Sequence, residues 1–130
     1  ASWIRVIRIQ NNTIILDAYN ANPTSMGLAL ESFKKTNYKN KMIIVGDMFE
    51  LGKDSNQYHQ EITNSLEKIN DSIIYIVGEY FCNTKHSDRI KSFSSTKELI
   101  NNLSKTNVSG YSILIKGSRA MQLEKIIEFI

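Results

Sequence analysis

Cysteine, proline and histidine are scarce in this chain. Its 130 residues include one cysteine, one proline and two histidines. The single cysteine, Cys82, excludes an internal disulfide framework and fits a reducing compartment, so we expect a cytoplasmic protein. Cys82 and His86 form one C-x3-H pair without a second pair, which falls short of the ligand set of a structural zinc ion. We therefore expect no metal site.

Long apolar runs and clusters of basic residues are also missing. The longest apolar runs, residues 42–45 and 73–77, are far shorter than the roughly 20 residues of a membrane-spanning helix. The N-terminus has no apolar segment typical of a signal peptide. The net charge of +3 comes from scattered Lys and Arg residues without interleaved aromatic residues. These patterns argue against a membrane or a nucleic acid as partner.

The sequence lacks the short motifs of self-sufficient nucleotide-binding and hydrolytic enzymes. Gly52-Lys53 is followed by Asp54, and residue 47 is not glycine, so there is no phosphate-binding P-loop. Neither G-x-G-x-x-G nor G-x-S-x-G occurs. A complete ATPase, dehydrogenase or serine hydrolase is therefore not expected. Any crevice in this chain would form half of a site.

What is present is the composition of one globular domain, 42% hydrophobic and 22% charged. Strand patterns alternate with helix patterns along the chain. We expect strands near residues 4–9, 13–16, 42–45, 73–77, 90–93 and 112–115, and helices at 24–36, 55–70, 79–82, 96–104 and 120–130. Asn11-Asn12 is the expected turn of the first hairpin, Pro23 opens the first helix, and Ser55 is the expected N-cap of the second.

This order predicts a three-layer α/β/α Rossmann-like domain. After the N-terminal β-hairpin the alternation implies parallel strands joined by right-handed crossovers, in a mostly parallel sheet of about six strands. Residues 120–130 are expected to close the chain as one helix, with Ala120, Leu123, Ile127 and Ile130 on its apolar face. We expect residues 1–130 to be a single domain, of which residues 1–12 are a linker and first strand. Because the chain begins without Met inside a predicted strand, we expect it to be a fragment of a longer protein.

The loops that leave the predicted strands are rich in polar side chains. In open α/β sheets, ligands bind in the crevice outside the carboxyl ends of the strands. The candidates there are Asp17, Tyr19, Asn20, Asn22 and Thr24 after one strand, Asp47 and Glu50 after a second, and Lys116, Ser118 and Arg119 after the last. Backbone N–H groups at 117–119 are suited to an anion. We expect these loops to converge on one ligand site.

Each of these residues also has a purely structural interpretation. Asn22 is suited to cap the helix that begins at Pro23, and Asp47 to cap a turn after Gly46. Lys116 and Arg119 could be solvated cations. His59 lies beside the apolar stripe of its helix, where a surface or half-buried structural histidine is favoured over a ligand. The residue types alone leave both interpretations open.

Four segments, taken together, resemble a known family. They are DAYNANPTSM at 17–26, VGDMFELG at 45–52, His59 after the ELG, and IKGSRA at 115–120. In this order and spacing they resemble the C-terminal domain of the Mur ligases, and most of all the member that adds the dipeptide D-Ala-D-Ala. The resemblance covers roughly residues 14–130. It implies a three-domain enzyme whose N-terminal domain binds a UDP-sugar peptide and whose central P-loop domain binds ATP and Mg²⁺.

The resemblance also implies a reaction and roles for the loop residues. In this family ATP converts the carboxylate of UDP-MurNAc-tripeptide into an acyl phosphate, which the amine of D-Ala-D-Ala then attacks. Asp17 would accept hydrogen bonds from ribose hydroxyls. The loop from Tyr19 to Thr24, with Asn20 and Asn22, would orient the acceptor or the nucleotide. Lys116, Ser118 and Arg119 would grip the dipeptide carboxylate, whereas Asp47, Glu50 and His59 would hold their loop in shape.

Other interpretations remain open at this stage. The chain could be the equivalent domain of another Mur ligase or of a folylpolyglutamate synthase, or a non-catalytic α/β binding module. The YNANP sequence at 19–23 favours the dipeptide-adding ligase over its sister ligases. Because the P-loop is missing, we expect the isolated domain to be inactive and to depend on the other domains of its own polypeptide. We expect a monomer.

Overall fold

The computed structural model describes residues 4–130, and the part of the expected N-terminal linker at residues 1–3 lies outside it. Six strands form one sheet: β1 (Arg5–Ile9), β2 (Asn12–Asp17), β3 (Lys41–Gly46), β4 (Ser72–Val77), β5 (Ile90–Phe93) and β6 (Ser112–Lys116). The strand order is β1-β2-β6-β3-β4-β5. Only the β1–β2 pair is antiparallel, and the other neighbours are parallel. The predicted fold class, including the hairpin, is confirmed.

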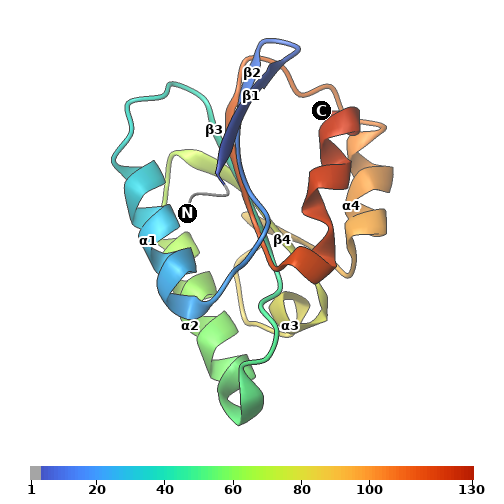
Figure 1. The fold of residues 1–130 in the computed structure, drawn as a ribbon. Helices are drawn as coiled ribbons and strands as arrows, with labels where there is room; N and C mark the ends of the chain where they lie inside the picture. Colours follow the sequence, from blue (N-terminus) through green and yellow to red (C-terminus); the bar gives the residue numbers. More distant parts are fainter. Residues whose placement is uncertain (1–3) are drawn as a thin grey trace.

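Helices cover both faces of this sheet. They are α1 (Pro23–Lys34), α2 (Ser55–Glu67), α3 (Glu79–Cys82) and α4 (Thr96–Leu103), with short 3₁₀ segments η1 (Gly52–Asp54), η2 (Arg119–Met121) and η3 (Leu123–Phe129). In Figure 1, α1 and α2 lie on one side of the strands, and α4 with the C-terminal segment lies on the other. Two apolar clusters fill the two interfaces, and β3 contributes to both because it is buried along its whole length. A central strand covered on both faces explains the continuous apolar run at 42–45.

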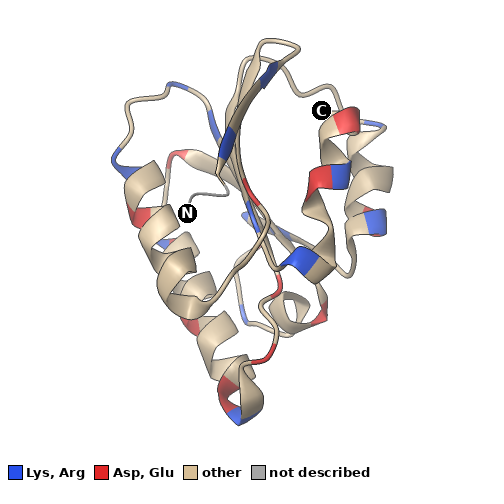
Figure 2. Ribbon diagram, in the orientation of Figure 1, with Lys and Arg blue, Asp and Glu red and all other residues tan. Residues whose placement is uncertain are grey.

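Charged residues are spread over the domain. Figure 2 shows Lys and Arg on strands, helices and loops on both sides of the sheet, interspersed with Asp and Glu. Within residues 4–130, no helix has the length and apolarity needed to cross a membrane.

The turn of the first hairpin lies one residue earlier than expected. Gln10 and Asn11 occupy it, with φ values of 54° and 65°, as a two-residue type I′ connection requires. Asn12 is instead the first residue of β2 and is 1% exposed. Its side chain donates from Nδ2 to the Val108 carbonyl at 2.8 Å and accepts from the Tyr111 N–H at 2.9 Å. Asn12 therefore fastens the hairpin to the segment that leads into β6.

The prediction of one continuous helix over 120–130 is wrong, although the segment is helical. The chain forms two 3₁₀ segments separated by Gln122, which has a φ of 53°. Leu123, Ile126 and Ile130 are buried, whereas Ala120 is exposed. The three-residue step from Leu123 to Ile126 matches the period of a 3₁₀-helix. The physical reason lies in the packing of Leu123 against the strand ends.

Glycines at the ends of β3 and β6 admit Leu123. A β-carbon at Gly46 would lie 2.9 Å from Leu123 Cδ1, and one at Gly117 would lie 2.7 Å from it. Both distances are too short for a side chain, so the two glycines leave the space that Leu123 fills. This close contact fixes the start of η3 and sets the register of the C-terminal segment.

The second helix also begins and ends differently from expectation. Its N-cap is Asp54, without a side-chain capping bond, and Ser55 is its first residue. The helix ends at Glu67 instead of residue 70. The Ser55 hydroxyl is not free to cap because it lies 3.4 Å from Nδ1 of His59, one turn along.

A buried and an exposed leucine provide a test of this core. Leu66 on α2 is 0% exposed and Leu28 on α1 is 65% exposed. We expect Leu66→Ala to lower the free energy of unfolding by about 2–5 kcal/mol, because it leaves a cavity. Leu28→Ala should change it by less than about 0.5 kcal/mol. Urea denaturation measures both, and equal losses would contradict the assignment of the core.

Candidate functional site

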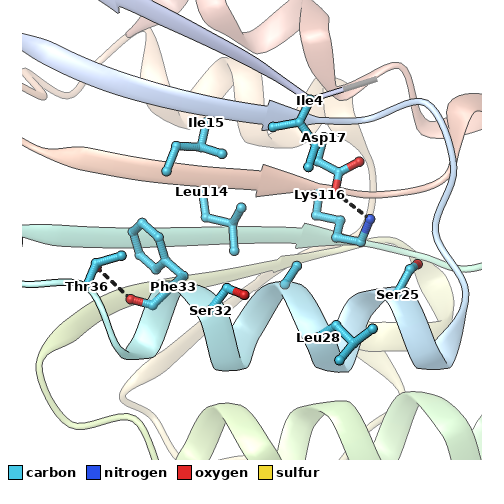
Figure 3. Close-up of a pocket in the computed structure, with 11 residues that line it drawn as sticks. Ile4, Ile15, Asp17, Ser25, Leu28, Ser32, Phe33, Thr36, Leu114 and Lys116 are labelled. Carbon is cyan, nitrogen blue, oxygen red and sulfur yellow. Dashed lines mark hydrogen bonds and ion pairs between the residues drawn. The ribbon is translucent and has the colours of Figure 1, made fainter. Parts of the chain in front are cut away.

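A buried ion pair joins the ends of two neighbouring strands. Asp17 ends β2, Lys116 ends β6, and the two are register partners in the parallel ladder. Lys116 Nζ lies 2.8 Å from Asp17 Oδ2 and donates a second hydrogen bond to the Asn20 carbonyl at 3.2 Å. The Lys116 side chain is 2% exposed. A buried ammonium is stable only when paired, so Lys116 holds both Asp17 and the backbone of the next loop in place (Figure 3).

The loop from Asp17 to α1 alternates buried anchors with exposed polar groups. Ala18 and Ala21 are buried, and Tyr19 and Asn20 between them are exposed. Asn22 is the N-cap of α1: its Oδ1 accepts from Ser25 N–H at 2.9 Å, and its own N–H donates to Ser25 Oγ at 3.1 Å. This reciprocal capping box satisfies two backbone N–H groups of the first turn. The prediction that Asn22 caps the helix beginning at Pro23 is therefore confirmed.

Asp47 caps a helix far away in sequence. It is 2% exposed, and its carboxylate accepts the N–H groups of Tyr80 and Phe81, both at 3.0 Å. The expected cap of a local turn after Gly46 is wrong, because the carboxylate points across the sheet edge to α3. Burial raises the pKa of Asp47, and the two amide hydrogen bonds and the nearby His59 act against that rise. Gly78, with a φ of +118°, has no room for a β-carbon beside this carboxylate.

His59 is more deeply buried than expected, with 0% exposure. Its Nε2 accepts the Met48 N–H at 3.0 Å, and its Nδ1 lies 2.7 Å from the Ser55 carbonyl. An accepting Nε2 requires the proton on Nδ1, which then donates to that carbonyl. The ring also stacks on Tyr80, with centroids 5.0 Å apart. His59 thus fixes the backbone of the loop after β3.

The loops after β2, β3, β4 and β6 meet at one edge of the sheet. Ser118 N–H donates to the Asp47 carbonyl at 3.3 Å, which links the β6 loop to the β3 loop. Arg119 is exposed, and its guanidinium lies 5.1 Å from the centroid of the Tyr19 ring. The β6 loop therefore contacts both its neighbours. This edge is where parallel strands place a ligand site.

The predicted site residues open onto different hollows at this edge. Asn22, Thr24 and Glu50 line one groove of about 720 Å³. Tyr19 and Arg119 line a second cavity of about 390 Å³ on the other side. Asp47 and His59 face the interior instead and line neither opening. The structure thus separates the candidates into exposed and buried groups.

A third cavity, of about 380 Å³, lies beside the ion pair. Figure 3 shows Ile15 and Leu114 from the sheet facing Leu28 and Phe33 from α1, with Asp17 and Lys116 at one end. No sequence pattern indicates this cavity, because its walls come from elements that only the fold brings together.

Comparison with known families supplies the identity of this arrangement. Residues 4–119 match the family described as Mur ligase, glutamate ligase domain. The chain belongs to this family. The predicted resemblance is therefore confirmed for almost the whole chain.

Similar full-length proteins point to one member of the family. The chain is 39% identical over 134 residues to the UDP-N-acetylmuramoyl-tripeptide–D-alanyl-D-alanine ligase of Rickettsia prowazekii, covering 96% of this chain and 29% of that protein. The ligase of the same name from Bacillus subtilis is 34% identical, over 89% of this chain and 27% of that protein. The chain thus spans less than a third of the length of these curated relatives.

Solved structures of Mur ligases have the same fold as this domain. A crystal structure of MurF from Acinetobacter baumannii matches with a TM-score of 0.78 and 30% identity, over 95% of this chain and 28% of that one. MurF from Thermotoga maritima in complex with ADP matches with a TM-score of 0.75 and 26% identity, over 95% of this chain and 29% of that one. The described residues thus form a Mur ligase domain of ordinary topology.

Two charged residues of this Mur ligase domain were missed by sequence reasoning. Arg5 and Glu124 line the cavity that contains Tyr19 and Arg119. Arg5 is the first residue of the hairpin, and its register partner is Leu16, next to Asp17 at the carboxyl end of β2. The hairpin register could have placed Arg5 at this edge.

No metal centre is apparent within residues 4–130. No group of three or more His, Cys, Asp and Glu side chains there is arranged to hold a metal ion.

Cys82 is a half-buried free thiol, and burial raises its pKa.

The contact between Gly78 and Asp47 provides a test of the buried part of the site. Gly78 and Gly110 have φ values of +118° and +82°, but only Gly110 has open space around its α-carbon. Gly110→Ala should cost about 1–2 kcal/mol of stability through backbone strain alone. Gly78→Ala should cost about 1–3 kcal/mol more, because the new methyl displaces the Asp47 carboxylate and because φ 118° with ψ 163° is a conformation almost confined to glycine. Denaturant unfolding of both variants measures the difference, and equal costs would rule out a tight contact.

Proposed function

We propose that this chain is the C-terminal domain of a ligase that joins D-Ala-D-Ala to UDP-MurNAc-tripeptide, a step in making peptidoglycan precursors. The observation that carries the proposal is the loop at 17–24, an exposed set of amide and hydroxyl groups anchored by the buried Asp17–Lys116 pair. Relatives that match 96% and 89% of this chain bear the name of that ligase. The bound ADP in the Thermotoga maritima relative supports the use of ATP. We propose that Mg²⁺ accompanies the ATP.

The rest of the enzyme lies outside this chain. The chain spans 29% of the Rickettsia prowazekii ligase, so the P-loop that holds ATP and Mg²⁺ would belong to a central domain of the same polypeptide, with the UDP-sugar peptide on an N-terminal domain. We expect the full protein to be a cytoplasmic monomer. In the proposed reaction the tripeptide carboxylate takes the γ-phosphoryl group and ADP leaves. The amine of the dipeptide then attacks the acyl carbon, loses a proton and expels phosphate.

Asp17 and Lys116 have different roles in this proposal. Lys116 Nζ donates a hydrogen bond to Oδ2 of Asp17. The other carboxylate oxygen, Oδ1, would accept a hydrogen bond from a ribose hydroxyl. Lys116 itself is buried and bonded to the Asn20 carbonyl, so it positions the loop rather than gripping the dipeptide. Because catalysis by phosphoryl transfer depends mostly on positioning, a fixed loop is the contribution this domain can make.

The exposed residues are the proposed ligand contacts. Tyr19, Asn20, Asn22 and Thr24 present hydroxyl and amide groups outward from the loop, where they would orient the dipeptide or the nucleotide. Arg119 is exposed and suited to bind a carboxylate through two parallel hydrogen bonds. Ser118 is 8% exposed and contributes through its backbone. Domain closure over these groups would keep water from the acyl phosphate.

Asp47, His59 and Glu50, the remaining predicted residues, stabilise the loop after β3. Asp47 holds α3, and His59 holds the Met48 backbone. Glu50 has a φ of 63° in the intervening loop. We propose that these three keep the loop after β3 in the shape that closure requires.

The acceptor preference of the intact ligase tests the proposed function. With ATP, Mg²⁺ and UDP-MurNAc-tripeptide, we expect phosphate release to depend on D-Ala-D-Ala. Release with a single amino acid instead would move the protein to a sister ligase. Silence with every acceptor would favour a non-catalytic binding module. The isolated 130-residue chain should release no phosphate, because it has no P-loop, and turnover by the pure chain would overturn the half-site interpretation.

Asn22 and Ser25 separate ligand binding from helix capping. Each forms one half of the capping box, so Asn22→Ala and Ser25→Ala should each cost about 0.5–2 kcal/mol of stability. In the intact ligase, Asn22→Ala should lower kcat/KM by about tenfold more than Ser25→Ala, the equivalent of about 1.4 kcal/mol of lost ligand contact. Equal effects of the two variants on ligation would show that Asn22 acts only as a cap.

A further inference from the structure

The cavity between α1 and the sheet has an exposed apolar rim. The cavity measures about 380 Å³, and Ile15, Phe33 and Leu114 supply much of its apolar lining. Leu28 on α1 is 65% exposed, and Ile4 is 52% exposed. Figure 3 shows these two side chains on opposite sides of the cavity. The opening is therefore bordered by apolar groups that are in contact with water.

Val6 extends this rim along the first strand. It is 62% exposed, and its register partner is Ile15, which lines the cavity. Residues directly opposite each other in an antiparallel pair share one face of the sheet, so Val6 lies on the face that carries the cavity. Single exposed apolar side chains are ordinary on a protein surface. Ile4, Val6 and Leu28 instead gather around one opening, as at a contact surface.

Gly27 gives a second, independent indication of contact at this place. It lies in the interior of α1, next to Leu28, where glycine is less favourable than alanine. Among the described residues, nothing lies within 4 Å of the position that its β-carbon would take. No contact inside the domain therefore requires a glycine here. A surface that approaches α1 closely from outside would require one.

The path of the polypeptide indicates which surface that is. In the proposed function a central domain precedes this chain, which spans 29% of the Rickettsia prowazekii ligase. That domain is joined to this one at the N-terminal end, and Ile4, the first residue that the structure describes, is part of the rim. A tethered domain has a high effective concentration at surfaces close to its tether. The central domain is therefore favoured over a separate protein as the partner.

The cavity is also continuous with the edge where the loops converge. Asp17 and Ser25 line it together with Leu28. Ser25 and Leu28 also line the groove that contains Asn22 and Thr24. A domain that closes over the loop at 17–24 would therefore meet the rim directly beside that loop.

We propose that, in the closed ligase, an apolar surface of the central domain covers this cavity, contacting Ile4, Val6 and Leu28 and passing close to Gly27. The proposal rests on the proposed function and goes beyond it, because it places a contact between domains on the α1 face, outside the ligand loops. Covering the rim removes apolar surface from water, which favours the closed form. The same groups are exposed when the domains separate.

A crosslinker at residue 28 tests which surface covers the cavity. The intact ligase with Leu28→benzoylphenylalanine is irradiated with and without UDP-MurNAc-tripeptide, Mg²⁺ and a non-hydrolysable ATP analogue. We expect an intramolecular crosslink from residue 28 to a peptide of the central domain, identified by mass spectrometry and increased by the substrates. Benzoylphenylalanine in place of Ile73 is the control. Ile73 is 38% exposed and pairs with Met42, which packs in the apolar cluster on the α4 side, so it should give no such crosslink.

A charge on the rim tests the same contact through activity. Leu28→Glu in the intact ligase should lower kcat/KM for D-Ala-D-Ala-dependent phosphate release by about tenfold or more, because closure would bury an unpaired carboxylate. Residue 28 is exposed, and glutamate is a good helix former, so the fold should be unaffected. Ile73→Glu makes the same kind of change on the other face of the sheet and should leave kcat/KM unchanged.

Gly27→Ala separates close approach from damage to the fold. Alanine stabilises a helix interior relative to glycine, so hydrogen exchange of the α1 amides in the intact ligase should become slower. The added methyl group should nevertheless lower kcat/KM by about fivefold or more, as overpacking at a tight contact does. Unchanged ligation by Gly27→Ala would contradict a close approach to α1.

Four outcomes would overturn the proposal. A crosslink from residue 28 to a second ligase molecule would make the rim a dimer contact, and a crosslink to the nucleotide would make the cavity a ligand site. The absence of any crosslink outside residues 4–130, or equal losses of activity in Leu28→Glu and Ile73→Glu, would remove the domain contact. Failure of the proposed function is distinguishable, since the unchanged ligase would then release no phosphate in response to D-Ala-D-Ala.

Discussion

One buried ammonium group organises the edge of the sheet where the loops converge. Lys116 lies at the end of β6, between β2 and β3, and its side chain is only 2% exposed. Because a buried charge needs partners, its position fixes Asp17 and the Asn20 carbonyl at 2.8 Å and 3.2 Å. The loop that follows can then reach the start of α1 in only a narrow range of conformations. Lys116 therefore positions the exposed groups at 19–24 without itself contacting a ligand.

The fold was largely accessible from the sequence, because its strands and helices carry clear local patterns. The apolar runs at 42–45 and 73–77 and the turn residues that bound them indicate buried parallel strands whatever their neighbours are. The C-terminal segment was not predictable in the same way. Its 3₁₀ form depends on Leu123 entering the space left by Gly46 and Gly117, two glycines at the ends of different strands. The spacing of apolar residues within one segment cannot predict a contact with residues that are distant in the sequence.

The candidate site was accessible in part. Polar residues directly after strands mark the ligand edge of an α/β sheet, and this rule identified the loops at 17–24, 47–50 and 116–119. Residue type does not tell which of these groups face a ligand. Asp47 and His59 face inward and bind backbone N–H groups, whereas Arg119 faces outward. Arg5 was missed because the register of the hairpin, and not a strand-end loop, places it at the cavity that Tyr19 and Arg119 line.

The position of β6 in the sheet has a consequence for how the domain folds. The last strand of the sequence pairs with both β2 and β3, and the ion pair it brings spans 99 residues. Contacts of such long range form late, because the chain entropy of closing the loop must be overcome first. During synthesis the hairpin and the β3–β5 half would leave the ribosome with an open slot between them. The edge of the sheet where the loops converge therefore forms only when β6 pairs with β2 and β3. A chain that ends before β6 would not form the candidate site.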